Sequence, residues 1–202
     1  MSGYGQNYDN GSVKVFKAGV NDDVTLAKFE LVSVDTAKYQ GETCLVTWEK
    51  DGQNITARFF PVNESNITPR QIKERDASGS LVDRMQTQQE AIDENYARLN
   101  SHIKHIAGCA STDEEWKEAT KGAKDFTSFI TAAAKLVEGK NYVGQLALGY
   151  KDKYLVIPSA MYVIGAYWSV NGKHQIVFQE KKNFKASPPV VATQEQAAST
   201  DW

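Results

Sequence analysis

The stretch LVTWEKDGQNITARFFPV, residues 45–62, decides the fold class of this chain of 202 residues. Two β-rich runs, TCLVTW and NITARFF, lie on either side of the sequence EKDGQ. Within that linker Asp51 and Gly52 are residue types that accept the positive φ angles of a tight turn. The pattern therefore predicts an antiparallel hairpin.

Pleating divides the side chains of this hairpin between two faces. Trp48 falls on the all-apolar face, so we expect it in the core, with a stacking role as the alternative. Arg58 and Phe60 fall on the opposite face and are candidates for ligand contact. The residues expected to share the inward face with Trp48 are Cys44, Val46, Ile55, Ala57 and Phe59.

Further β-rich runs precede and follow this hairpin. VTLAKFELVSV, residues 24–34, breaks strict alternation near Lys28 and Phe29, which predicts a bulge or a coiled strand of the kind that a small barrel needs. Alternation returns in NYVGQLALGY, and YLVIP is expected to pair with it across the KDK turn. MYVIGAYW and HQIVFQ are expected to add strands.

The middle of the chain has a helical period. Its apolar residues predict one long amphipathic helix with Ser80 as its N-cap and Gly108 as its stop. The periodic positions are Leu81, Met85, Ile92, Tyr96, Leu99, Ile103 and Ile106.

Two shorter helices are expected next. Thr112 and Glu115 have the spacing of a capping box, and DFTSFITAAAKLV, residues 125–137, predicts the last helix. We therefore expect a helical insertion at about residues 66–139.

Composition sets the domain limits. Residues 1–12 are expected to form a disordered arm, and residues 186–202, which lack lysine and arginine, a flexible C-terminal tail. Residues 13–185 are expected to form a single domain.

The order of elements favours an α+β or mainly β fold, because no strand-helix-strand alternation appears. The five-stranded OB-fold places its helix between the third and fourth strands, which is where this insertion falls. We therefore expect an OB-fold-like antiparallel barrel with a helical insertion between strands 3 and 4.

The net charge of −2 conceals an uneven distribution. Residues 135–185 contain 8 lysines and 3 acidic residues, together with several tyrosines. Such a segment is a footprint for a polyanion, and solubilising lysines on an ordinary strand surface are the alternative. No run approaches the roughly 18 apolar residues of a membrane span, and no signal peptide is recognisable, so we expect a cytoplasmic protein without a membrane partner.

Three stretches carry a family resemblance: VTLAKFEL with CLVTWEKDGQNITARFFPV, then DFTSFITAAAKLV, then LALGYKDKYLVIP. Together they resemble the single-stranded DNA-binding proteins of bacteriophages that have an OB-fold. The resemblance implies a viral accessory protein that coats and protects single-stranded DNA in replication, recombination or repair, in the host cytoplasm. In such families a negatively charged tail ending in an aromatic residue recruits partner enzymes, and here the tail ends with Asp201 and Trp202.

Aromatic residues with neighbouring cations are the side chains that a sequence-tolerant binder of single strands needs. Arg58 beside Phe60 meets this requirement. The alternative is that exposed turn lysines and amphipathic tyrosines cover the ends of the barrel. The further candidates for nucleic-acid contact lie at the two hairpin tips: Lys50, Tyr150, Lys151, Lys153 and Tyr154.

Signals for metal binding or catalysis are weak. His102, His105 and Cys109 share one helical face and could bind zinc with Cys44 or His174 as fourth ligand, but histidines at helix ends usually serve as caps. Phosphate-binding and nucleophile motifs are absent from the sequence. We therefore expect no enzyme, metal or cofactor. The alternative function is a viral structural or assembly protein that acts through protein contacts, favoured by the lack of a dense basic stripe.

Overall fold

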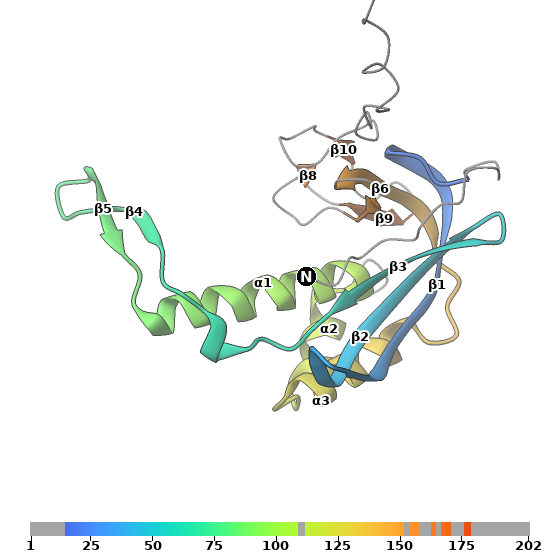
Figure 1. The fold of residues 1–202 in the computed structure, drawn as a ribbon, viewed down its shortest axis with the longest axis horizontal. Coiled ribbons are helices and arrows are strands. Elements are labelled where there is room, and N and C mark those ends of the chain that lie inside the picture. The colour runs from blue at the N-terminus through green and yellow to red at the C-terminus, as the bar shows by residue number, and fades with distance from the viewer. Residues whose placement is uncertain are drawn as a thin grey trace, which may run out of the picture.

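An antiparallel sheet and three helices give the chain an α+β fold (Figure 1). The computed structural model describes residues 15–108, 112–151, 154–157, 163–164, 167–170 and 176–178. The main sheet has the order β3-β2-β1-β6-β7, and β9 also pairs with β6. Its strands are β1 Gly19–Thr36, β2 Tyr39–Lys50, β3 Gln53–Phe59, β6 Val143–Lys151, β7 Tyr154–Val156 and β9 Trp168–Val170.

The predicted hairpin is confirmed as β2 and β3, with Lys50 opposite Gln53 at the turn. Asp51 has a φ of 47° and Gly52 a φ of 75°. The Gly52 amide donates to the Glu49 carboxylate at 2.9 Å, which closes the turn. A left-handed backbone at both central positions matches the twist of the flanking strands, so this turn sets the register of the hairpin.

We predict that Gly52→Ala lowers the free energy of unfolding by about 1 kcal/mol, because a Cβ at positive φ is strained. Chemical denaturation measures the change. Gly122→Ala is the matched control, since Gly122 has open space around its Cα and no positive φ. Equal stability of the two variants would contradict the role assigned to the turn.

One strand, β1, serves two partners. Its first residues pair with β6, from Gly19 opposite Leu148 to Thr25 opposite Val143. From Thr25 onward it pairs with β2, and the register shifts between Leu26 and Lys28. The break in alternation near Lys28 is thus confirmed as a bulge.

The long helix begins later than its period predicts. Residues 71–85 form a hairpin of β4 Gln71–Arg75 and β5 Leu81–Met85, and α1 spans Gln88–Gly108. Asp76 is the physical reason, because its carboxylate accepts from the amides of Ser78 and Ser80 and stabilises a turn there. The helix is instead capped by Thr87, whose hydroxyl accepts from the Glu90 amide.

The two shorter helices are confirmed as α2 Asp113–Thr120 and α3 Phe126–Val137. Thr112 caps α2 through the predicted capping box with Glu115. Asp125 caps α3 by accepting from the Ser128 amide at 2.7 Å. The segment between β3 and β6 therefore holds three helices, and it also holds a short 3-10 helix, Glu64–Asn66, and the β4–β5 hairpin, neither of which was expected.

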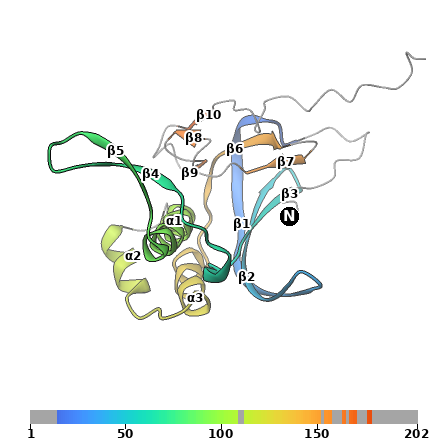
Figure 2. The same cartoon turned by 60° about the vertical axis from the view of Figure 1, so that its left-hand side comes forward.

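The helices pack against one face of the sheet (Figure 2). Trp48 from β2 and Trp168 from β9 meet edge to face, with ring centroids 6.1 Å apart. Phe29 of β1 contributes to the same buried cluster. The largest fully buried side chains of this cluster are Trp48, Trp168, Phe16, Ile55, Ile103, Ile106, Ile130, Leu146, Leu148, Leu155 and Val24.

Two further short strands, β8 Val163–Ile164 and β10 Val177–Phe178, pair with each other. The strands expected near the C-terminus thus exist in part. Within the described residues no pairing joins β3 to β7. The expected terminal segments, 1–12 and 186–202, lie outside the described residues.

Candidate nucleic-acid interface

Arg58 lies on the outer face of the sheet. Its neighbours in β3, Ala57 and Phe59, pack against the core, whereas Arg58 is exposed. It stands opposite Leu45 of β2, which in turn stands opposite Glu30 of β1. Within the part of the chain that the structure describes, no carboxylate forms an ion pair with Arg58. A solvated cation on a sheet face is available to a phosphate.

Phe60 has an aromatic partner that the sequence did not suggest. Its ring meets that of Tyr39 at a centroid distance of 4.9 Å and an interplanar angle of 82°. Tyr39 is oriented by its hydroxyl, which donates to the Glu42 carbonyl at 2.8 Å. Tyr39 follows the turn between β1 and β2, so a pairing with Phe60 is visible only in three dimensions. The two rings form an aromatic pair next to the C-terminal end of β3.

Trp48 is fully buried, as the pleat predicts. Its contact with Trp168 places it among the side chains between the sheet and the helices. A buried ring offers no face to a base, so Trp48 contributes to the core of the fold.

The second hairpin is confirmed by the register of β6 and β7, with Lys151 opposite Tyr154 and Tyr150 opposite Leu155. Tyr150 is partly buried and packs against the core, so its ring is less available than expected. Tyr154 is also partly exposed. Lys153 lies outside the described residues, and only the backbone of Lys151 is described.

Lys50 forms a hydrogen bond within the fold. Its ammonium group donates to the Asp22 carbonyl at 2.6 Å. The Asp22 carboxylate in turn accepts from the Gln145 amide at 2.7 Å, which ties the hairpin turn to β1 and β6. Lys50 is thus a structural contact as well as a surface cation.

The candidates do not converge on one cluster. Arg58 and Phe60 lie at one end of the β2–β3 hairpin, and Lys50 lies at the other. From Gln145, beside Asp22, to Lys151 the strand runs six residues, or roughly 20 Å. The candidate residues therefore lie at separate places along the sheet.

The histidines considered as zinc ligands make other contacts. His105 Nε2 lies 2.8 Å from the Trp168 carbonyl, and His102 Nδ1 lies 3.4 Å from the Tyr167 hydroxyl. Cys109 and His174 fall outside the described residues. Cys44 is buried in the core, which raises the pKa of its thiol to about 12. Among the described residues no group of three His, Cys, Asp or Glu side chains could hold a metal ion.

His102 gives the fold a pH dependence. Burial lowers its pKa, and the nearby His105 and Arg98 lower it further. The folded state therefore resists protonation at a pH where the unfolded histidine, with a pKa of about 6.5, already binds a proton. The stability that this neutral imidazole contributes is present above that value and is lost as the pH falls through it.

We predict that the melting temperature falls between about pH 7.5 and pH 5.5, a range in which carboxylates stay ionised. His102→Gln should flatten this part of the profile. Thermal unfolding followed by circular dichroism provides the measurement. A wild-type profile with no slope in this range would contradict the assignment.

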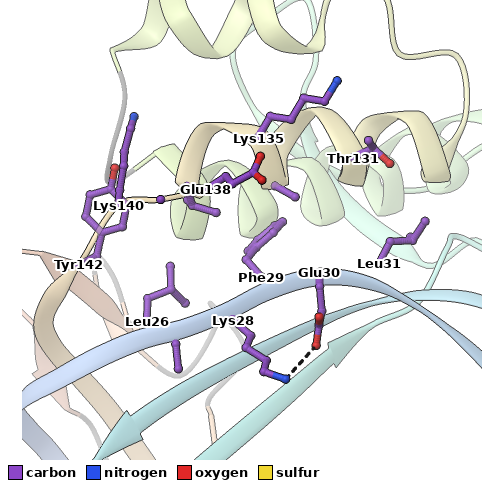
Figure 3. A pocket seen from close by; sticks show the side chains of 14 residues that line it. Leu26, Lys28, Phe29, Glu30, Leu31, Thr131, Lys135, Glu138, Lys140 and Tyr142 are labelled. Carbon is purple, nitrogen blue, oxygen red and sulfur yellow. Dashed lines mark ion pairs between the residues drawn. The ribbon is translucent and has the colours of Figure 1, made fainter.

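A groove between β1 and α3, with a volume of about 490 Å³, is a feature that the sequence did not suggest (Figure 3). Leu26, Phe29 and Leu31 line it from the strand, and Val137 lines it from the helix. Figure 3 shows Phe29 pointing toward α3 and Lys28 pointing away, where it pairs with Glu30 at 3.8 Å. The groove is therefore apolar at its base, and the charged residues Lys135, Glu138 and Lys140 also line it.

Comparisons with models of known protein families, with curated proteins and with solved structures find no match for this chain. None of the helices that the structure describes is long and apolar enough to cross a membrane.

Proposed function

We propose that this protein binds single-stranded DNA without sequence specificity and coats it during replication, recombination or repair. The observation that carries the proposal is the exposed Arg58, which has no carboxylate partner among the described residues, on a sheet face that ends in the Tyr39–Phe60 aromatic pair. Cations and aromatic rings along one strand are the chemistry that a phosphate backbone with unstacked bases requires.

The fold proposed for this function is a partly open OB-fold-like barrel. Trp48 and Trp168 touch although β1 and β6 separate their strands in the sheet order. In a flat sheet three strand spacings are about 14 Å, so a ring contact between those strands favours a curled sheet. If β6 and β7 are the fourth and fifth barrel strands, the insertion falls where the OB-fold places its helix.

The proposed mechanism uses two kinds of contact, aromatic stacking on bases and cationic contacts with phosphates. Tyr39 and Phe60 stack on bases, and Arg58 neutralises phosphate and releases counterions. The hairpin of β6 and β7 extends the path through Lys151 and Tyr154, which are cross-strand neighbours. The proposal includes no catalytic step. The tail with Asp201 and Trp202, outside the described residues, is proposed to recruit replication or recombination enzymes.

We predict that Arg58→Ala weakens binding to an oligo-dT strand and reduces the slope of log affinity against log salt by about 0.7, the contribution of one phosphate contact on a single strand. Fluorescence anisotropy at several salt concentrations measures both quantities. Lys124→Ala is the matched control, because Lys124 is exposed between α2 and α3. A slope unchanged by Arg58→Ala would remove this arginine from the interface.

A second variant separates stacking from charge. Phe60→Ala should reduce affinity by about tenfold, since stacking of one base on an aromatic ring contributes about 1 to 3 kcal/mol. The salt slope should stay at the wild-type value, because no charge is removed. A changed slope with unchanged affinity would oppose a stacking role.

The alternative function, assembly through protein contacts, is favoured by one observation. Leu81, Val82 and Met85 of β5 are exposed large apolar side chains. A defined oligomer at all salt concentrations, without oligonucleotide binding, would favour this alternative.

A further inference from the structure

Thr43 of β2 is a buried polar residue on the face of the sheet that the helices do not cover (Figure 2). The next residue, Cys44, belongs to the core, so strand alternation directs Thr43 to the outer face together with Leu45. A threonine on an outer face is normally solvated, yet Thr43 is 0% exposed. Other side chains of the same face therefore cover it.

The Thr43 hydroxyl has no hydrogen-bond partner among the residues that the structure describes. A buried hydroxyl without a partner destabilises a fold, because it gives up its hydrogen bonds to water and forms none in return. Proteins retain such groups mainly at functional sites, where a second state of the molecule satisfies them. This hydroxyl is thus a candidate for contact with a ligand on the outer face.

The Tyr39–Phe60 pair lies over this position. The register of β2 and β3, continued by one residue, places Phe60 opposite Thr43. Tyr39 lies on the same face of β2 as Thr43, and its ring extends over Gly41, where an added Cβ would lie 2.9 Å from the Tyr39 hydroxyl oxygen. The two rings meet edge to face at a centroid distance of 4.9 Å. We call this pair the cover of Thr43.

Stacking of a base between the two rings requires the cover to open. A base between two aromatic rings needs about 7 Å between their planes, because each stacking contact takes about 3.5 Å. An edge-to-face pair at 4.9 Å lacks this space. The Tyr39 ring is held in place by the hydrogen bond from its hydroxyl to the Glu42 carbonyl. Breaking that bond lets the ring move and uncovers Thr43.

Arg58 and the uncovered Thr43 can reach the same ligand group. Arg58 stands opposite Leu45, and Thr43 is two positions before Leu45 on the same face. Diagonal neighbours of this kind are about 7 to 8 Å apart, a distance that one phosphate with a hydrogen bond on either side can span. A hydroxyl that donates to a phosphate carries no sequence information, as a sequence-tolerant binder requires.

We propose that Thr43 is a phosphate-binding residue that the Tyr39–Phe60 pair hides in the free protein. Entry of a base between the two rings displaces Tyr39, and the Thr43 hydroxyl then donates to the phosphate that Arg58 neutralises. The inference rests on the proposed function and deepens it, because it adds a contact that forms only when the strand binds.

Thr43→Val tests the hydroxyl, because it removes that group and keeps the branched shape of the side chain. Its affinity for oligo-dT, measured by fluorescence anisotropy, should fall about tenfold with the loss of a charge-assisted hydrogen bond. Its melting temperature should stay the same or rise, since an unsatisfied buried group is removed. The matched control is Thr47→Val, because Thr47 is buried on the same face of β2 and should not contact the strand.

Two results of this first experiment would overturn the proposal. One is a Thr43→Val variant that binds oligo-dT with wild-type affinity. The other is a variant that loses affinity and thermal stability together, because the hydroxyl would then serve the fold.

Tyr39→Phe tests the opening of the cover. It removes the hydrogen bond to the Glu42 carbonyl and keeps an aromatic ring. A contact that is lost on binding opposes binding, so the affinity for oligo-dT should rise by about threefold to tenfold. A Tyr39 ring that stacks without moving predicts no such gain. Unchanged or weaker binding by Tyr39→Phe would therefore overturn the role of the cover.

Three homopolymers identify the group that Thr43 contacts. With a phosphate as the acceptor, Thr43→Val should lose the same factor of affinity on oligo-dT, oligo-dA and oligo-dC. The slope of log affinity against log salt should stay at the wild-type value, because no charge is removed. A loss confined to one of the three would assign the hydrogen bond to a base and overturn the phosphate contact.

The wild-type titration separates this inference from the proposed function. Wild-type binding that Thr43→Val retains in full removes the inference and leaves the proposed function standing. A wild-type protein that binds none of the three homopolymers removes the proposed function, and the inference falls with it.

Discussion

The bulge between Leu26 and Lys28 is the constraint on which the rest of this structure depends. It lets one strand, β1, pair with β2 along most of its length and with β6 at its beginning. On either side of the bulge, Leu26 and Phe29 both reach the buried cluster while Lys28 stays outside. The helices then cover the apolar face, and the outer face is left for charged and aromatic side chains.

Local chemistry explains what could be predicted from the sequence. The hairpin of β2 and β3 depends on Asp51 and Gly52, and α2 depends on a capping box, so both signals lie within a few residues. The start of α1 could not be read from the apolar period. Leu81 and Met85 are four residues apart, and that spacing places two side chains on the same face of a helix and also of a strand. The hydrogen bonds of Asp76 decide between the two.

The candidate site likewise has features that could be predicted from the sequence and features that could not. Strand alternation places Arg58 outward and Trp48 inward, because each position follows from its neighbours. Alternation does not reveal that Tyr39 meets Phe60, or that the Lys50 ammonium group binds a carbonyl of β1. Tyr150 is less exposed than a hairpin tip suggests because it continues a strand whose residues 146–148 are all fully buried. The groove depends on contacts between distant segments, and a single sequence carries no local mark of it.

The long segment inserted between β3 and β6 has a consequence for the order in which the protein folds. The buried Asn21 side chain donates to the Leu146 carbonyl across 125 positions of sequence. Strands β1, β2 and β3 are joined by short turns, so they can pair at little cost in loop-closure entropy. Pairing of β6 with β1 closes a long loop, so it costs more entropy and is expected to form later. On a nascent chain the meander is complete long before β6 is synthesised. Its first strand keeps an unpaired edge during that interval, and the folding chain is then most exposed to aggregation.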